Sequence, residues 1–405
     1  MIRNRTILFL HQNFPGQFLH LARHLSRENR VLFLSRKTPN RLARVRLVEY
    51  DLHREPDARI HPYLSGPERG ILHGQAVVRE LLKLRREGIR PDLIVGHTGW
   101  GETLFVKDVF PDVPLLSYFE FYYSTLGADV GFDPEFPSDP DLKFRLRIRN
   151  QAILSCLEAT DRGLSPTRWQ QERLPAPFRS KVAVIHDGVD TDAVRPGQEA
   201  SVTLPNGRSF DAATPVVTYV ARNLEPYRGF HIFMRAVQPI LDRNPAAEVM
   251  IVGGDDVSYG SRLPGGETYR ERALRETQVD LSRVHFTGKL PYATYLNLLQ
   301  VSAAHVYLTY PFVLSWSMIE AMATGCLLVA SRTPPVEEVI RDGENGLLVD
   351  FFDVDAIAQR VTQALQDPER FKPLRQAARR TAMERYDLSR VCLPQQVGLL
   401  EEMLG

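Results

Sequence analysis

Two arginines flank the point where an apolar run gives way to an expected helix in VVTYVARNLEPYRGF, residues 216–230. Arg222 ends the run, and Arg228 precedes a glycine at which the helix should begin. A guanidinium group presents its N–H donors in a rigid fork that matches phosphate oxygens. We therefore expect this loop to bind a diphosphate, with a pair of solvated arginines as the plain alternative.

A lone carboxylate, Glu320, stands in the otherwise apolar segment SMIEAMATGC, residues 317–326. The pattern predicts a helix from about Ser315 to Gly325, with Glu320 near its second turn on the face that packs against a sheet. A buried carboxylate needs hydrogen-bond partners. We expect a polar ligand such as a ribose diol to supply them.

Polar residues also follow apolar runs in the first half of the chain. DLIVGHTGWGE places His97 after such a run, and YFEFYY sets Glu120 and Tyr122 among aromatic rings. A histidine there can hold a hydroxyl or move a proton, and rings beside a carboxylate suit a sugar. A structural histidine and a packed tyrosine cluster are equally compatible. In HQNFPGQF, Gly16 before Gln17 allows either a close substrate approach or a tight turn.

The elements that must position these residues alternate between strand and helix. Apolar runs predict strands at 6–11, 30–35, 92–97, 114–120, 181–189, 216–222, 248–254, 284–288, 304–310, 326–331 and 345–350. Apolar positions three and four apart predict helices at 17–29 and 69–88, among others. Such alternation is typical of doubly wound α/β domains with parallel sheets, whose ligands gather at the carboxyl ends of strands.

The length of 405 residues favours two domains of roughly 200 residues each. Periodicity is lost between residues 187 and 213, where Gly, Pro, Asp and Thr gather. We predict a first domain over 1–190, a second over 191–385, and a terminal helix within 386–405 that packs back towards the first domain.

The composition excludes several classes of protein. A hydrophobic content of 43% and a charged content of 24% fit a globular protein. No apolar run is long enough for a membrane span, and the N-terminus does not resemble a signal peptide, so we expect a cytoplasmic protein. The three cysteines are widely spaced and odd in number, which argues against a disulfide framework and against a zinc site.

Charge is distributed unevenly along the chain. Residues 1–90 hold 18 Lys and Arg against 8 Asp and Glu. A solvated surface is one explanation, and an anionic lipid or a phosphorylated substrate is another. Basic residues also alternate with apolar ones in KFRLRIR, 143–149, which fits either peripheral membrane contact or a half-buried element. No nucleic-acid-binding pattern accompanies these charges.

Taken together, the motifs resemble the retaining glycosyltransferases of family four, which have the GT-B fold. IHDGVDTDAVRP is similar to the linker signature of that family, VARNLEPYRGF to its diphosphate loop, and IEAMATGCLLVASRTPPVEEVIRDGENGLLV to its donor-binding segment. HQNFPGQF, GHTGWGETLF and YFEFYY resemble one bacterial subgroup. The resemblance covers nearly the whole chain and implies two Rossmann-like domains that face each other across a cleft.

The resemblance also implies roles for individual residues. Arg222 and Arg228, the latter at a position where many relatives have lysine, would bind the donor diphosphate. Glu320 would hold the ribose, with Glu338 approaching the same site, and His97 would contact the transferred sugar. Gly16 and Gln17 would lie near the diphosphate, and the region of Gly288 and Lys289 would contact the base. The acceptor-side candidates are Trp100, Glu102, Glu120 and Tyr122.

One position departs from the family. A second glutamate usually precedes the ribose-binding one by eight residues, and here that position is Phe312. Phe312 has two interpretations: it forms the wall of a less polar donor pocket, suited to a deoxysugar, or it fills the core beside Pro311. Backbone N–H groups near Leu314 and Ser315 are alternative replacements for the missing contact.

The implied reaction moves a sugar from a nucleotide-diphosphate donor to a hydroxyl, with retention, in surface polysaccharide or glycoconjugate synthesis. We expect no cofactor and no metal, because arginines would stabilise the leaving diphosphate and the Asp-x-Asp stretches at 139, 190 and 353 fit helix caps or turns. The acceptor would be lipid-linked or otherwise anionic. A nucleotide-sugar epimerase and a sugar-nucleotide-binding protein without catalysis are the rival interpretations.

Overall fold

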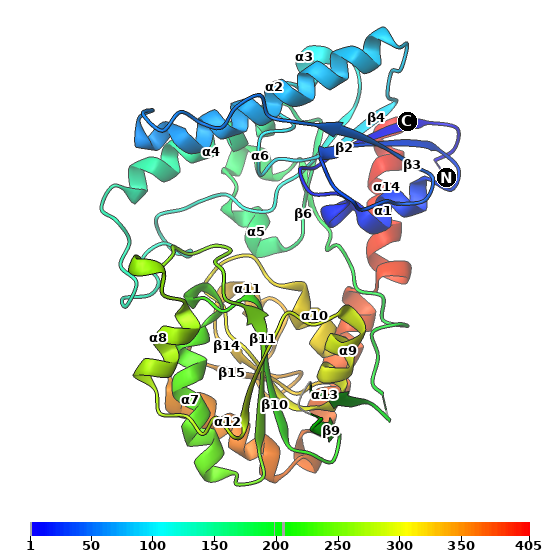
Figure 1. The fold of residues 1–405 in the computed structure, drawn as a ribbon. Coiled ribbons are helices and arrows are strands. Elements are labelled where there is room, and N and C mark those ends of the chain that lie inside the picture. Colours follow the sequence, from blue (N-terminus) through cyan, green and yellow to red (C-terminus); the bar gives the residue numbers. More distant parts are fainter. Residues whose placement is uncertain (1, 198, 205–206) are drawn as a thin grey trace. The chain divides into compact units, whose positions relative to one another are not determined.

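The computed structural model describes residues 2–197, 199–204 and 207–405. It divides into two compact units. Unit 1 comprises the chain up to Gly188 together with Ser389–Gly405, and unit 2 comprises Val189–Leu388. The chain therefore leaves unit 1 once and returns to it, as the colours of Figure 1 show.

Unit 1 contains a parallel sheet of seven strands in the order β3-β2-β1-β4-β5-β6-β7. Its strands are β1 (Thr6–Leu10), β2 (Arg30–Arg36), β3 (Val45–Tyr50), β4 (Leu93–His97), β5 (Leu115–Tyr118), β6 (Arg162–Ser165) and β7 (Val182–Val184). β1 pairs with β2 on one side and β4 on the other, so that the strand order reverses between β1 and β4. This reversal is the switch point at which doubly wound sheets bind their ligands.

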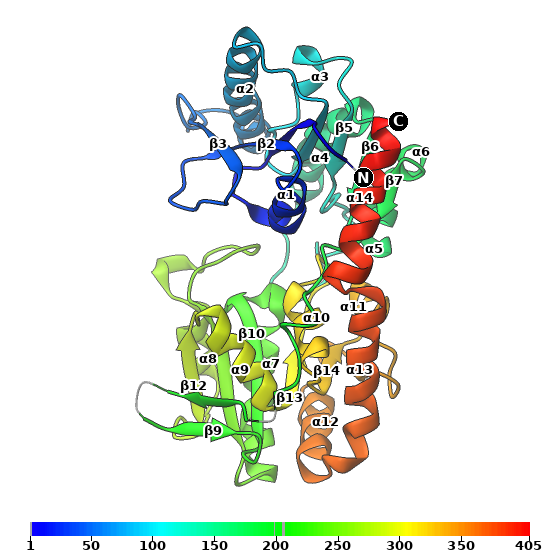
Figure 2. The same cartoon turned by 90° about the vertical axis from the view of Figure 1, so that its right-hand side faces the viewer.

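Alternating residues of β1 face two helical layers. Ile7 and Phe9 pack in a cluster with α1 (Leu19–Leu25) and α14 (Leu393–Leu404), whereas Leu8 and Leu10 pack with α2 (Ser65–Arg86). Figures 1 and 2 both show α14 beside α1. The remaining helices of unit 1 are α3 (Val106–Val109), α4 (Leu142–Ala159), α5 (Arg168–Arg173) and α6 (Ala176–Arg179). Both faces of the sheet are thus covered, as parallel sheets require.

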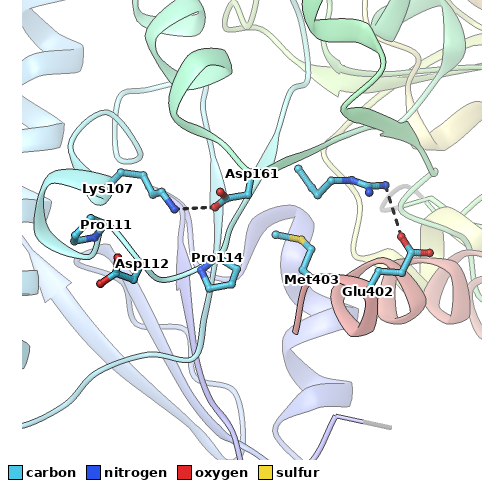
Figure 3. Close-up of a pocket in the computed structure, with 8 residues that line it drawn as sticks. Lys107, Pro111, Asp112, Pro114, Asp161, Glu402 and Met403 are labelled. Carbon is cyan, nitrogen blue, oxygen red and sulfur yellow. Dashed lines mark hydrogen bonds and ion pairs between the residues drawn. The ribbon is translucent and has the colours of Figure 1, made fainter. Parts of the chain in front are cut away.

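A pocket of about 460 Å³ opens at the amino ends of β5 and β6 (Figure 3). Four of its charged side chains form two ion pairs: Lys107 binds Asp161 at 2.8 Å, and Arg162 lies 3.7 Å from Glu402 of α14. The pocket lies at the amino ends of the strands, whereas the switch point lies at their carboxyl ends. It is therefore distinct from the sites predicted at the carboxyl ends of strands.

Unit 2 repeats the same strand order in a parallel sheet of six strands, β12-β11-β10-β13-β14-β15. Its strands are β10 (Val216–Asn223), β11 (Glu248–Gly254), β12 (Val284–Gly288), β13 (Ser302–Tyr307), β14 (Leu328–Ser331) and β15 (Leu347–Val349). A hairpin of β8 (Ser201–Thr203) and β9 (Ser209–Asp211) precedes the sheet. The switch point of unit 2 lies between β10 and β13.

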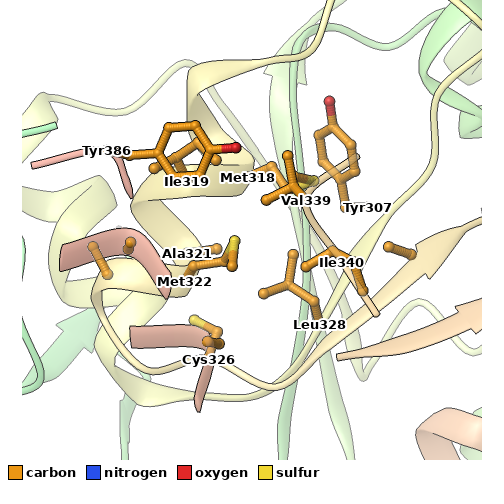
Figure 4. Packing of buried hydrophobic residues seen from close by; sticks show 14 of the residues in the cluster. Tyr307, Met318, Ile319, Ala321, Met322, Cys326, Leu328, Val339, Ile340 and Tyr386 are labelled. Carbon is orange, nitrogen blue, oxygen red and sulfur yellow. The ribbon is translucent and has the colours of Figure 1, made fainter. Parts of the chain in front are cut away.

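Helices enclose this second sheet from both sides (Figure 1). They are α7 (Phe230–Arg243), α8 (Tyr269–Glu276), α9 (Tyr292–Val301), α10 (Trp316–Ala323), α11 (Pro334–Glu337), α12 (Val354–Gln366) and α13 (Lys372–Arg385). Met318, Ile319 and Met322 of α10 fill the cluster drawn in Figure 4, against Leu328 of β14. This packing fixes the helix that carries Glu320.

The structure shows both parallel-sheet domains, which confirms the predicted fold class. It also contains two strands that the apolar runs did not predict, β3 and β6. The β8–β9 hairpin lies inside the stretch that loses periodicity, and its two strands flank the segment PNG at 205–207, where the sequence predicts a hairpin-like turn; residues 205 and 206 of that turn lie outside the described residues. Among the described residues, no helix is both long and apolar enough to span a bilayer.

Candidate functional site

At the switch point of unit 1, three side chains form a directed chain of hydrogen bonds. The backbone N–H of Asn13 donates to Nδ1 of His11 at 2.9 Å, so the ring carries its proton on Nε2. Nε2 lies 2.6 Å from Oε1 of Gln17, to which it therefore donates. The amide nitrogen of Gln17 then donates to Oε1 of Glu120 at 3.3 Å. Gly16 is required here, because a Cβ on it would lie 2.6 Å from the His11 ring.

His97 lies beside this chain, at the end of β4. Its ring stacks between Trp100 and Tyr118, with centroid distances of 4.5 and 5.2 Å, and only 1% of the residue is exposed. The backbone N–H of Gly99 donates to Nδ1 at 3.0 Å, which leaves the proton on Nε2. Burial, with the nearby His11, holds the pKa of His97 well below its usual value, so the ring is neutral.

The other acceptor-side candidates lie elsewhere in unit 1. Glu102 is fully enclosed and accepts a 2.7 Å hydrogen bond from the hydroxyl of Tyr50, which also lies 2.9 Å from Nδ1 of His73. Burial raises the pKa of Glu102 to about 7. Tyr122 packs against the cluster around Phe119. The prediction that Glu102 faces an acceptor is not supported, because its side chain has no exposed surface.

In unit 2, two cationic side chains come from the carboxyl ends of strands, Arg222 from β10 and Lys289 from the residue after β12. Arg222 is exposed, and neither its side chain nor that of Lys289 makes a hydrogen bond or ion pair with any residue that the structure describes. The side chain of Lys289 crosses over Gly254, where a Cβ would lie 2.8 Å from its Cε and 2.7 Å from Oδ1 of Asn223. Lys289 thus reaches from the end of β12 to the residue next to Arg222.

The acids near this edge are already neutralised. Asp255 lies 2.6 Å from Arg270, and Asp256 lies 2.7 Å from Arg262. Arg222 and Lys289 therefore leave uncompensated positive charge where strands end, which is the electrostatic condition for binding an anion.

Arg228, the second predicted diphosphate ligand, is bound internally. It is 7% exposed, and its Nη1 donates to Oγ1 of Thr309 at 2.8 Å and to the carbonyl of Val313 at 2.9 Å. These contacts bridge the switch point from β10 to the segment after β13. Gly229 permits this approach, because its φ is +68° and a Cβ would lie 2.4 Å from that of Leu308.

Glu225 organises the neighbouring loop, a role that the sequence did not reveal. It is 1% exposed, and its carboxylate accepts the backbone N–H groups of Ser258, Tyr259 and Gly260 at 3.1, 3.1 and 2.8 Å. The loop is thereby held with the Tyr259 ring 5.3 Å from the guanidinium of Arg228.

Phe312 packs in the same aromatic group. Its ring meets Tyr227 and Tyr259 edge to face, at centroid distances of 5.4 and 4.9 Å, and the residue is 6% exposed. Phe312 therefore packs as part of an aromatic group, with the ring of Tyr259 against one side of its own ring. Leu314 is buried as well. The N–H of Ser315, the suggested substitute donor, donates to the Tyr307 hydroxyl at 2.9 Å.

The carboxylate of Glu320 accepts hydrogen bonds from other residues of the protein. Its two carboxylate oxygens accept hydrogen bonds from the hydroxyls of Tyr292 and Tyr295 of α9, at 2.6 and 2.8 Å. Tyr292 is 56% exposed and Tyr295 is 8% exposed. The half-buried carboxylate is therefore held in a fixed orientation on the side of α10 that meets α9.

Two further donor-site candidates, Gly288 and Glu338, follow elements of unit 2, and the Asp-x-Asp stretches cap turns and helices. Gly288 ends β12 with a φ of +66°, and the half-buried Glu338 follows α11, while its neighbour Glu337 lies 3.8 Å from Arg332. The first Asp of each Asp-x-Asp stretch accepts backbone N–H groups. The carboxylates are those of Asp139, Asp190 and Asp353, as predicted for caps and turns.

Comparisons with known proteins identify both units. Residues 27–194 match the family model described as glycosyl transferase family 4 group, and residues 214–367 match that of glycosyl transferases group 1. A D-inositol 3-phosphate glycosyltransferase of Kribbella flavida is 26% identical over 331 residues, which cover 77% of this chain and 74% of the relative. A phosphatidyl-myo-inositol mannosyltransferase of Mycolicibacterium smegmatis is 30% identical over 207 residues, but these span only 46% of its length.

Solved structures share the fold over the full chain. A sucrose-phosphate synthase of Thermosynechococcus elongatus superposes with a TM-score of 0.71 at 19% identity, covering 99% of both chains. HepE of Anabaena, solved in complex with UDP, gives a TM-score of 0.66 at 16% identity over 98% of this chain and 99% of its own. The family matches favour a transferase over an epimerase or a binding protein. The protein is therefore a nucleotide-sugar glycosyltransferase of the GT-B fold, in which a segment that matches the family 4 group is followed by one that matches group 1.

Proposed function

We propose that the protein transfers a sugar from a nucleotide diphosphate to a hydroxyl acceptor with retention at the anomeric carbon. The observation that carries the proposal is the pair of cations at the carboxyl edge of unit 2, Arg222 and Lys289, which lack acidic partners among the described residues. A donor diphosphate carries the negative charge that would neutralise these two cations.

The geometry of unit 2 supports the following donor-binding roles. Arg222 and Lys289 bind the diphosphate directly, and Arg228 adds positive charge from beneath the Tyr259 ring. Glu320, already oriented by Tyr292 and Tyr295, binds the ribose. The backbone at Gly288 lies at the carboxyl end of β12, where the base would bind. Glu338 follows α11, the short helix that comes after the carboxyl end of β14.

The transfer requires little covalent chemistry from the protein. The bond between the anomeric carbon and the diphosphate oxygen breaks, and the acceptor oxygen bonds to the same face of that carbon. The acceptor proton passes to the leaving diphosphate, whose charge Arg222 and Lys289 stabilise. Because these cations neutralise the leaving group, we propose a metal-independent reaction, and turnover unchanged by a chelator would agree with it. Proton NMR of the newly formed anomeric centre tests retention.

The acceptor is proposed to be anionic or lipid-linked. Unit 1 carries the basic excess of residues 1–90, and two relatives are named for inositol-phosphate or phosphatidylinositol acceptors. On α4, Leu146 is buried whereas Phe144 is 51% exposed between Lys143 and Arg145. This arrangement supports peripheral contact with an anionic membrane. Sedimentation with phosphatidylglycerol vesicles, compared with phosphatidylcholine vesicles, tests it.

The decisive experiment measures donor hydrolysis by mass spectrometry over a panel of UDP, GDP, TDP and ADP sugars, without acceptor. Arg222→Ala should abolish nucleotide release. Arg262→Ala is the matched control, because Arg262 is an exposed arginine at the same edge whose charge is already paired with Asp256. Equal losses in both variants would contradict the assignment of Arg222 to the diphosphate.

A further inference from the structure

Tyr259 is an exposed member of the aromatic group beside Arg228, in the loop that follows β11. It is 36% exposed, whereas Phe312 and Arg228 next to it are buried. The guanidinium of Arg228 lies 5.3 Å from the centre of the Tyr259 ring, which is close enough for a cation–π contact. The ring of Tyr259 therefore covers one of the two arginines that the sequence assigned to the diphosphate.

Arg228 keeps its charge beneath this ring. Burial opposes the charge, but Tyr307 and Tyr259 hold the pKa of Arg228 above its usual value. The hydrogen bonds from its Nη1 to Thr309 and to the carbonyl of Val313 fix the guanidinium inside unit 2. The cation is thus withdrawn from the surface, and Tyr259 is the more exposed of the two side chains.

The hydroxyl of Tyr259 has a proton that it can donate to a ligand. Among the described residues, none accepts a hydrogen bond from it. An anionic oxygen is the best acceptor for this proton, because a charge-assisted hydrogen bond is about twice as strong as a neutral one. The positive charge of Arg228 favours the same kind of ligand. A phosphate oxygen meets both conditions, whereas an ammonium group meets neither.

Two buried side chains of unit 2 hold Tyr259 close to the strand end that carries Arg222. The carboxylate of Glu225 accepts the backbone N–H groups of three successive loop residues, with Tyr259 in the middle. Nδ2 of Asn223, the residue after Arg222, donates to Oγ of Ser258 at 2.8 Å. The loop is therefore tied at two points to the carboxyl end of β10 and the segment that follows it.

From this geometry we propose that the hydroxyl of Tyr259 donates a hydrogen bond to the diphosphate of the donor, and that Glu225 is a positioning residue for Tyr259. The proposal rests on the function proposed above and involves side chains of unit 2 alone. It gives Arg228 a way to act on the diphosphate although its own side chain is bonded internally: the charge of Arg228 strengthens the hydrogen bond that Tyr259 donates.

Tyr259→Phe is the informative variant, because it keeps the ring beside Arg228 and removes only the hydroxyl. Calorimetric titration of wild type with UDP, GDP, TDP and ADP identifies the preferred diphosphate, and the variant is titrated with that diphosphate and with the corresponding nucleoside. Losing a hydrogen bond to a charged ligand should weaken the diphosphate about ten- to a hundredfold and leave the nucleoside unchanged.

Tyr269→Phe is the matched control for the order of the loop. The hydroxyl of Tyr269 donates to the carbonyl of Ser261 at 2.7 Å, so this variant also removes one tyrosine hydroxyl that contacts the loop. It leaves the hydroxyl of Tyr259 in place. Tyr269→Phe should therefore bind the diphosphate within about twofold of wild type.

The positioning role of Glu225 has its own readout. In Glu225→Gln, the amide nitrogen cannot accept from the backbone N–H groups that the carboxylate now binds. Glu225→Gln should weaken the diphosphate in the wild-type background and cause no further loss in the Tyr259→Phe background, because both changes act through one hydroxyl. Additive losses would show that Glu225 has only a structural role and would overturn that part of the proposal.

Four outcomes overturn the assignment of Tyr259. Diphosphate affinity within about twofold of wild type in Tyr259→Phe refutes it. An equal loss for the nucleoside would place the contact outside the diphosphate, and an equal loss in Tyr269→Phe would attribute the effect to the order of the loop. A loss confined to the nucleotide sugar would place the hydroxyl on the transferred sugar. The proposed function fails separately, if Arg222→Ala leaves nucleotide binding intact.

Discussion

Arg222 and Arg228 look equivalent in the sequence, but the structure predicts that their replacement by lysine has different consequences. Arg228 is buried, and its Nη1 serves both Thr309 and the carbonyl of Val313. Lysine lacks the planar fork and should keep only one of these contacts. Losing one hydrogen bond from a charged donor costs about 1.5–3 kcal/mol.

That loss translates into a measurable melting temperature. In a unit of this size, each kcal/mol shifts Tm by about 2–4 °C, so Arg228→Lys should lower the Tm of unit 2 by about 3–12 °C. Arg222→Lys is the matched control, because an exposed side chain without a partner among the described residues should change stability by less than about 0.5 kcal/mol. Scanning calorimetry of both variants measures the difference.

Nucleotide binding should show the opposite order. Arg222→Ala should weaken binding of the nucleotide diphosphate about ten- to a hundredfold, because a charged hydrogen bond to the ligand is lost. Arg228→Lys should bind nearly as tightly, since its charge is retained. An unchanged Tm for Arg228→Lys, or equal Tm losses in the two lysine variants, would refute the reasoning.

Three further variants test other parts of the structure. Phe312→Glu would place a carboxylate between Tyr227 and Tyr259 and should lower Tm more than Phe312→Leu does; an unchanged donor preference across the sugar panel would contradict the reading of Phe312 as a pocket wall. Tyr292→Phe removes one of the two hydroxyls that orient Glu320 and should weaken UDP binding more than binding of 2′-deoxy-UDP; equal effects on both ligands would exclude a link to the ribose. Burial raises the pKa of Glu102 to about 7, so its stabilising effect is present below its unfolded value of 4.5 and is lost as the pH rises through 7. The Tm of wild type minus that of Glu102→Gln should therefore fall between pH 4.5 and 8, and a flat difference would refute the assignment.

The sequence predicted the features of the fold and the site that depend on a local pattern of residues. Apolar runs located the central strands of both sheets, and the positions of Arg222 and Glu320 at a strand end and on a helix followed from them. The apolar runs did not predict β3, because its apolar residues are half-exposed and alternate with charged ones. This pattern is typical of an edge strand. The apolar runs did not predict β6 because its sequence, RGLS, contains only one large apolar side chain, that of Leu164.

Contacts between distant segments were beyond the reach of local pattern. Glu320 meets Tyr292 and Tyr295 only because α9 and α10 pack on the same face of the sheet. Glu225 meets its loop 33 to 35 residues later in the chain. Arg228 is bonded whereas the Arg222 side chain has no partner among the described residues. This difference depends on Thr309 and Val313, which follow β13 some 80 residues later in the chain, so no single motif encodes it.

The return of the chain to unit 1 has a consequence for the order of events on the ribosome. Leu399 and Leu400 of α14 complete the apolar cluster around Phe9 and Phe33, yet they are translated after the whole of unit 2. At about 5–20 residues per second, some 200 intervening residues delay them by about 10–40 s. During that interval unit 2 can fold completely, while the face of the first sheet that α1 and α14 share lacks the second of these helices.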